Sequence, residues 1–189
     1  MRLAPPAHFR RSRRFSLALA TLGLLLSSAA WGAPPVIPHA QDKPPGPALS
    51  PEESLTHMRV PEGFQVELVA HEPDLVNPVA MCFDERGRIW VCESLEYPRR
   101  APGEGRDRIK VFEDTNGDGT ADKMTVFAEG LNIPSAIAVG HGGVWVANSP
   151  DILFLKDTDG DDRADTREVI VTGFGRTDTH ELPNSFTWG

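Results

Sequence analysis

One sequence pattern occurs twice in this chain, and it limits the fold more than any other feature. A β-type run at Ile109–Glu113 leads into an Asp-rich turn at 114–122, and a second run at Ile152–Lys156 leads into a matching turn at 157–165. The two turns begin 43 residues apart, at Asp114 and Asp157. A repeat of this size, filled with short strands, is typical of a β-propeller blade. The pattern therefore predicts sheets built one after another along the chain.

Each repeat contains four segments with the composition and alternation of β-strands. The expected strands are 79–83, 88–92, 109–113 and 124–128 in the first repeat, and 135–139, 144–147, 152–155 and 168–171 in the second. Ile89–Ser94 and Val144–Ser149 match position by position, and a third repeat opens at Leu182–Phe186. We predict an all-β fold: a partial β-propeller of about two four-stranded antiparallel blades plus the start of a third.

Two blades alone leave two apolar sheet faces uncovered, whereas a closed ring leaves none. We therefore expect residues 50–189 to be the N-terminal part of a propeller domain, a fragment of a longer protein that is inactive by itself. Phe64, Val66 and Leu68 alternate with polar residues and predict a further strand. An N-terminal strand of this kind commonly completes the last blade of a ring.

The N-terminal residues have the character of a targeting segment. An apolar run at 15–26 and a small-residue end at 30–33 follow four arginines, Arg10, Arg11, Arg13 and Arg14. This pattern predicts a cleavable signal peptide over 1–32 and export to the periplasm or the extracellular space, with the Sec and twin-arginine routes both open. The run is shorter than the roughly 20 residues of a transmembrane span.

Residues 33–49 are rich in proline and predict an extended linker. Ser50 and Glu53 then form a capping-box pattern with Pro51 at the first helical position, which predicts a helix over 51–57.

The net charge of −8 disfavours a nucleic-acid partner, and removing residues 1–32 makes the chain more acidic still. Cys82 and Cys92 lie in neighbouring predicted strands. In an oxidising compartment they could form a disulfide, and two buried free thiols are the equal alternative.

Both Asp-rich turns resemble calcium-binding loops, with oxygen side chains at alternate positions. The first offers Asp114, Asn116, Asp118 and Asp122 at positions 1, 3, 5 and 9, with the Thr120 carbonyl at position 7. The second offers Asp157, Asp159, Asp161 and Asp165 at the same positions, with Glu168 at position 12.

Each turn also lacks one element of the pattern. The first has Thr125 at position 12, and the second has Asp162 where the first has Gly119. The flanking segments are strands, so neither turn is an EF-hand. We predict Ca²⁺ at both turns; the alternative is a pair of acidic hairpin turns, because Asp, Asn and Gly form turns without a cation.

His180 is the candidate catalytic residue. It lies in the link after the fourth strand of the second repeat, where the earlier repeats have Leu75 and Leu131. This link and the long insert at 93–108 are expected on one face of the sheets, opposite the Asp-rich turns. A polar residue that breaks the repeat there suggests a functional site; the alternative is an ordinary exposed histidine.

Several segments resemble a known family over about residues 50–189. They are Pro61–Phe64, Asn77–Pro78, Phe83–Gly87, Glu113–Asp122 and His180–Phe186. The resemblance is to the N-terminal propeller of the PVC-type membrane-bound dehydrogenases, large secreted bacterial proteins with a haem-binding CxxCH. Those propellers are distantly similar to the soluble quinoprotein glucose and sorbosone dehydrogenases. In that group the base is a histidine nine residues before a hairpin glycine, and His180 and Gly189 have this spacing.

The resemblance implies an oxidation of a sugar or alcohol in which His180 takes the hydroxyl proton. Pyrroloquinoline quinone would accept the hydride, and a cytochrome would accept the electrons. Candidate contacts to the quinone or substrate are Glu96, Tyr97, Arg99 and Arg100. The haem c of the relatives would lie beyond Gly189. The alternative function is a non-enzymatic propeller, stiffened by calcium, that binds glycans or a protein partner.

Overall fold

The computed structural model describes residues 46–98 and 103–189. The chain divides into two compact units, Met1–Pro47 and Ala48–Gly189, and the fold described below is that of the second unit. The predicted signal peptide and most of the predicted linker lie outside the described residues, as do Arg99 and Arg100. In the part of the chain that is described, no helix has the length and apolar character needed to cross a membrane.

The helix α1 covers Pro51–His57, as predicted. Its capping box is complete: Ser50 Oγ accepts from the Glu53 amide at 3.1 Å, and the Glu53 carboxylate accepts from the Ser50 amide at 3.0 Å. These two bonds satisfy amides that have no partner within the helix, which explains why the helix begins here.

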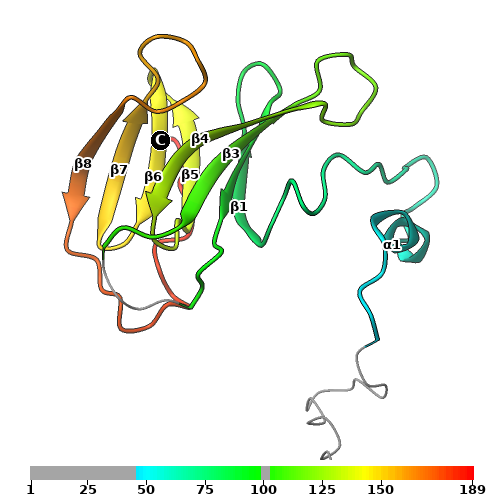
Figure 1. The fold of residues 1–189 in the computed structure, drawn as a ribbon, viewed down its shortest axis with the longest axis horizontal. Coiled ribbons are helices and arrows are strands. Elements are labelled where there is room, and N and C mark those ends of the chain that lie inside the picture. The colour runs from blue at the N-terminus through cyan, green and yellow to red at the C-terminus, as the bar shows by residue number, and fades with distance from the viewer. Residues whose placement is uncertain (1–45, 99–102) are drawn as a thin grey trace, which may run out of the picture. The chain divides into compact units, whose positions relative to one another are not determined.

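The other regular elements are eight strands in two antiparallel sheets (Figure 1). The first sheet contains β1 (Pro78–Phe83), β2 (Ile89–Glu93), β3 (Asp107–Glu113) and β4 (Lys123–Leu131). The second sheet contains β5 (Ala136–Gly140), β6 (Gly143–Asn148), β7 (Asp151–Lys156) and β8 (Thr166–Thr172). In each sheet the spatial order follows the chain order. The prediction of an all-β fold with two four-stranded antiparallel sheets is therefore confirmed.

The main core lies between the two sheets. Alternate residues of each strand point to one face, and these residues form one buried cluster: Trp90, Cys92, Ile109 and Val111 from the first sheet, and Val144, Val146, Leu153 and Leu155 from the second. Strand β5, the first strand of the second sheet, lies against β1, the first strand of the first sheet. Trp90 is 4% exposed and its ring meets Phe127 edge to face, with centroids 4.8 Å apart. The burial of these side chains is what holds the sheets together.

The contact between the sheets is head-to-tail. Trp90 points from the first sheet into the shared core, whereas its repeat equivalent, Trp145, packs on the opposite face of the second sheet with Ala136, Ala147 and Ile152. Each sheet therefore offers one kind of face to the sheet before it and another kind to the sheet after it. A contact of this type can be extended in one direction, into a ring or a filament.

The two cysteines are free thiols, which decides between the alternatives left open by the sequence. Cys82 pairs with Trp90 and Cys92 with Ala80, so the thiols are not directly opposite each other. Cys92 is fully buried in the core between the sheets, and this burial raises the pKa of its thiol far above the usual value.

The strand predicted at 64–70 does not form, so that prediction is wrong. Its alternating sequence needs a neighbouring strand to pair with, and none lies beside it among the described residues. The predicted opening of a third repeat is also not a strand. Leu182 is nevertheless 5% exposed, and Phe186 packs on the outer face of the second sheet.

A buried ion cluster fastens the segment before β1 to the first sheet. Glu93 is fully buried and its carboxylate contacts Lys110 Nζ at 3.0 Å and Arg108 Nε at 2.5 Å. The same carboxylate accepts from the Val76 amide at 2.7 Å, and Lys110 Nζ also donates to the Asp74 carbonyl. The two buried charges, Glu93 and Lys110, thus have partners where water is excluded, and Arg108 joins them from a partly exposed position.

Candidate functional site

Each Asp-rich turn follows the third strand of its sheet, as predicted. The first loop, residues 114–122, joins β3 to β4, and the second loop, residues 157–165, joins β7 to β8. Asp114 accepts from the amides of Gly117 at 2.7 Å and Gly119 at 2.8 Å. Asp157 makes the equivalent bonds to the amides at 160 and 162, at 2.6 and 2.9 Å. The Gly119 amide is the main reason that the pKa of Asp114 lies below its usual value.

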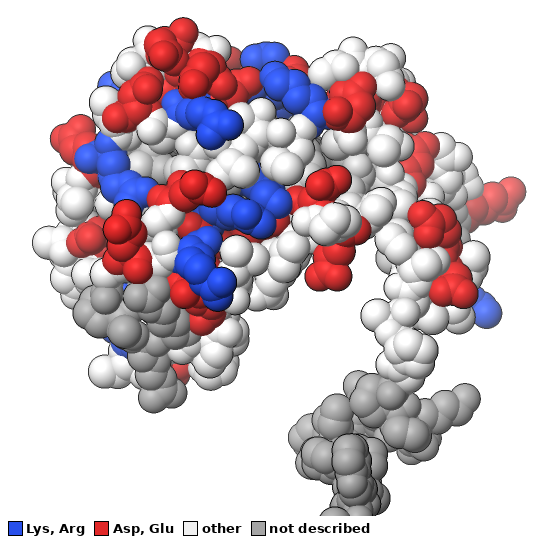
Figure 2. Space-filling model, in the orientation of Figure 1, with Lys and Arg blue, Asp and Glu red and all other residues white. Residues whose placement is uncertain are grey.

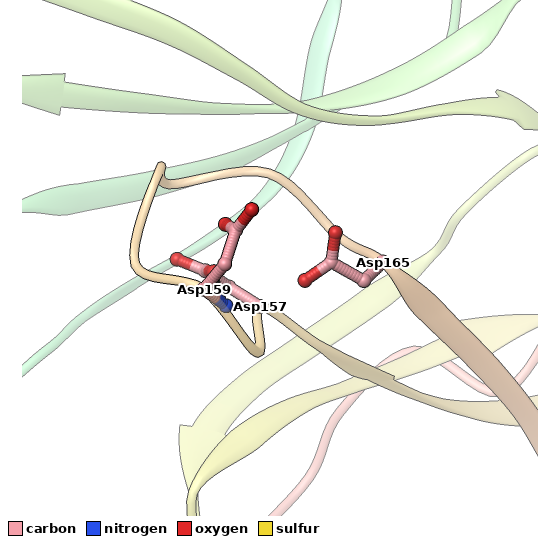
Figure 3. A group of neighbouring side chains, drawn as sticks. All are labelled: Asp157, Asp159 and Asp165. Atoms are coloured by element: carbon pink, nitrogen blue, oxygen red, sulfur yellow. Dashed lines mark hydrogen bonds between the residues drawn. The ribbon is translucent and has the colours of Figure 1, made fainter.

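The second loop brings three carboxylates together. One carboxylate oxygen from each of Asp157, Asp159 and Asp165 lies within 4.8 Å of the other two, and all three side chains come from this loop (Figure 3). Ca²⁺ binds oxygens at about 2.3–2.6 Å, so ligands on opposite sides of the ion are about 5 Å apart. This spacing fits a hard cation.

The other predicted ligands are not part of that group. Asp161 accepts from the Arg163 amide at 2.8 Å, and Glu168 is exposed in β8, paired with Phe154 of β7. Position 12 of the calcium-loop pattern falls in β8, so Glu168 is held in the β7–β8 pairing and not in the loop.

The first loop does not gather its carboxylates in this way. Asp114, Asn116, Asp118, Thr120 and Asp122 are all exposed. The Asp122 carboxylate accepts from the amide and hydroxyl of Thr115 at 3.0 and 2.9 Å, and Asn116 Nδ2 donates to Asp118 at 3.1 Å. These oxygens are used to shape the turn itself.

Asp162, which replaces the usual loop glycine, connects the two sheets. Its φ is +64°, and its carboxylate contacts Arg88, which directly precedes β2, at 2.6 Å and Lys123 of β4 at 3.2 Å. The Arg88 bond is the main reason that the pKa of Asp162 lies below its usual value, so the carboxylate is ionised at neutral pH. Figure 2 shows acidic and basic side chains interspersed on the face of the molecule that is in view.

We expect Asp162→Gly to destabilise the chain by about 1–2 kcal/mol, because partly buried charge-assisted bonds are lost while only a small left-handed strain is relieved. Asp162→Asn keeps the side-chain size and tolerance of positive φ, so it separates the charge from the backbone effect. Urea unfolding measures both. A Gly variant more stable than the parent would show that backbone strain outweighs the ion bridge.

On the opposite side from the loops, the structure places His180 beside Tyr97. The two rings meet edge to face with centroids 5.7 Å apart, although they are far apart in sequence. The His180 Nδ1 atom lies 3.0 Å from the Asp178 carboxylate, which also accepts from the His180 amide at 2.9 Å. His180 and Asp178 are exposed, with side chains 70% and 64% accessible. The Asp178 contact uses Nδ1, so Nε2 is the ring nitrogen left for chemistry with a ligand.

The other predicted contacts differ in position. The Glu96 carboxylate accepts hydrogen bonds from the Arg106 amide at 2.8 Å and from Arg106 Nε at 3.2 Å. Arg99 and Arg100 lie outside the described residues. Asp178 was missed by the sequence reasoning, although an acid two residues before the candidate base in a short loop is a usable signal.

The sequence also matches a protein-family model. A profile described as a domain of unknown function, DUF7133, matches residues 50–189. The chain belongs to the DUF7133 family. The family match covers the helix, both sheets, both Asp-rich loops and the His180 loop. No curated protein matches the chain.

Two solved structures are similar, both of Carbohydrate-Active Enzymes Family AA12 from Trichoderma reesei. The iodide structure is 19% identical with a TM-score of 0.44, over 59% of this chain and 27% of that chain. The calcium structure is 19% identical with a TM-score of 0.43, over 59% and 26%. The chain thus spans about a quarter of the length of the structures it resembles.

Proposed function

We propose that this chain forms consecutive blades of a propeller in an exported, quinone-dependent dehydrogenase that oxidises a sugar or alcohol and passes the electrons to a cytochrome. The observation that supports it is the His180 arrangement. A tertiary contact brings Tyr97 to the histidine, and Asp178 bonds its Nδ1. The rest of the proposal comes from the family resemblance of the sequence.

In this proposal His180 is the general base. A neutral imidazole that donates its Nδ1 proton to Asp178 carries its lone pair on Nε2, which then accepts the proton of a substrate hydroxyl. Asp178 is a positioning residue that also stabilises the imidazolium formed. When bound, the quinone supplies the hydride acceptor.

The described residues fit the quinone only in part. The Tyr97 ring, 39% exposed beside His180, can pack against a flat ring system. Glu96 does not fit, because its negative charge repels the carboxylates of such a cofactor and is already paired with Arg106. Contact of Arg99 and Arg100 with the quinone carboxylates stays a prediction.

The test is dye-linked dehydrogenase activity in the full product of the gene, supplied with quinone and calcium. We expect His180→Ala to lower the rate about 10²–10⁴-fold, the usual contribution of a general base. His57→Ala, which changes an exposed histidine of α1, is the matched control and should leave the rate unchanged. Equal rates in the His180 variant would remove this residue from the mechanism. No activity in the parent protein would favour the glycan- or protein-binding alternative.

We also propose that Ca²⁺ binds the second loop, whose three carboxylates converge. With a Kd in the range of 10⁻⁴–10⁻³ M and about tenfold excess calcium, binding should add about 1–2 kcal/mol to the free energy of unfolding. Thermal unfolding with calcium, magnesium or chelator measures this. Asp159→Asn should abolish most of the gain, and Asp118→Asn in the first loop should not. A gain that survives Asp159→Asn would place the ion elsewhere.

A further inference from the structure

One backbone hydrogen bond joins the second loop to the sheet before it. The Ala164 amide donates to the carbonyl of Phe127 at 2.8 Å. Phe127 is a bulge residue in the outermost strand: Val126 and Ala128 pair with consecutive residues of β3, so Phe127 is skipped. Its carbonyl is free to accept from the loop because it takes no part in the ladder.

The first loop makes the same bond. The Ala121 amide, at the same loop position as Ala164, donates to the carbonyl of Val69 at 3.0 Å. Val69 belongs to the segment whose alternating sequence predicts a strand. This segment therefore has the position relative to the first loop that β4 has relative to the second. In both cases an Asp-rich loop rests on the element that precedes its sheet.

The second sheet carries the same acceptor. Ile170 of β8 is skipped just as Phe127 is, because Val169 and Val171 pair with consecutive residues of β7. Among the described residues, no backbone amide from outside the sheet reaches the Ile170 carbonyl. The two sheets thus share a docking feature, and only the first has it occupied.

The burial of the two outer strands differs accordingly. Phe127 is 3% exposed beneath the second loop, whereas every residue of β8 is exposed. Three consecutive apolar side chains of β8, Val169, Ile170 and Val171, are 53, 40 and 47% exposed. A run of exposed β-branched residues on a strand is unusual for a free surface and typical of an interface.

We infer that β8 is a docking site for a further sheet of the same repeat, one that carries an Asp-rich loop after its third strand. The loop lies over β8, and the amide at its eighth position donates to the Ile170 carbonyl. The occupant follows from continuity with the existing contact between the sheets, because the same loop amide donates to the preceding element at both Asp-rich loops. This inference does not depend on the role of His180.

The first test uses the full chain and a synthetic peptide of residues 108–128, which reproduces the β3–loop–β4 hairpin, closed by a disulfide between two cysteines added at its ends. The control peptide carries Ala121→Pro, which removes the docking amide. We expect the native peptide to slow hydrogen exchange at 168–172 by about tenfold or more, and the control to have little effect. Val169→Asp in the chain should abolish the protection.

The second test does not require an isolated hairpin to fold. Residues 83–132 are added after Thr187, in the register in which Leu182 corresponds to Asn77, so that the chain gains a third repeat of its own sequence. Slower exchange in β8, lost again when the added loop carries the Ala121→Pro change, supports the docking site. Exchange in β8 that neither the peptide nor the added repeat slows would overturn it. So would equal protection by the native and proline forms.

Discussion

Glu93→Ala should lower the free energy of unfolding by about 3–5 kcal/mol, because it leaves Lys110 as a buried charge without its counter-ion. Glu93 is fully buried and Lys110 has a side chain only 3% exposed. The substitution also removes the acceptor of the Val76 amide. Urea unfolding followed by far-UV circular dichroism measures the loss.

The control is Glu113→Ala, which removes an acid paired with the more exposed Arg86 and Lys123. Surface ion pairs are worth about 0–1 kcal/mol, so this loss should be several times smaller. Glu93→Asn is also informative, because Asn148 occupies the equivalent place in the second sheet and accepts from the Asn132 amide at 2.7 Å. Equal losses for Glu93→Ala and Glu113→Ala would mean that the buried cluster is not desolvated.

Trp90→Ala should cost about 3–5 kcal/mol, the usual range for removing a buried large aromatic side chain. Trp90 fills the space between the sheets, contacts Phe127, and donates from Nε1 to Asp84 at 2.9 Å. Trp90→Phe keeps most of the packing and isolates the hydrogen bond. Thermal and urea unfolding of the three forms separate the two contributions.

The repeat supplies a matched control in Trp145→Ala. Trp145 is half-buried on the outer face of the second sheet, and its Nε1 has no partner among the described residues. The loss should be clearly smaller than for Trp90. A loss as large as that of Trp90 would show that the outer face is as tightly packed as the face between the sheets.

The sheets and the helix could be predicted because their signals are local. Alternating apolar residues recur in both repeats, and the capping box at Ser50 involves neighbours three residues apart. The strand expected at 64–70 does not form because a strand depends on a pairing partner, which the alternation of Phe64 and Val66 does not reveal.

The details of the candidate sites could not be predicted because they depend on contacts between distant residues. Asp162 looked like a defect in a calcium loop, yet its partner Arg88 lies 74 residues away, directly before β2 of the other sheet. The burial of Glu93 could not be predicted, because its neighbours along the chain do not show which charges surround it in the folded protein. The Tyr97–His180 contact likewise depends on how two loops are brought together by the sheets.

The reactivity of the Cys92 thiol reports whether the two sheets have separated. A thiol reagent needs the thiolate and a path to it, and the fully buried, high-pKa Cys92 offers neither while the sheets stay closed. Alkylation of this single atom therefore reports how often the two halves of the molecule open, in native conditions and without any added label.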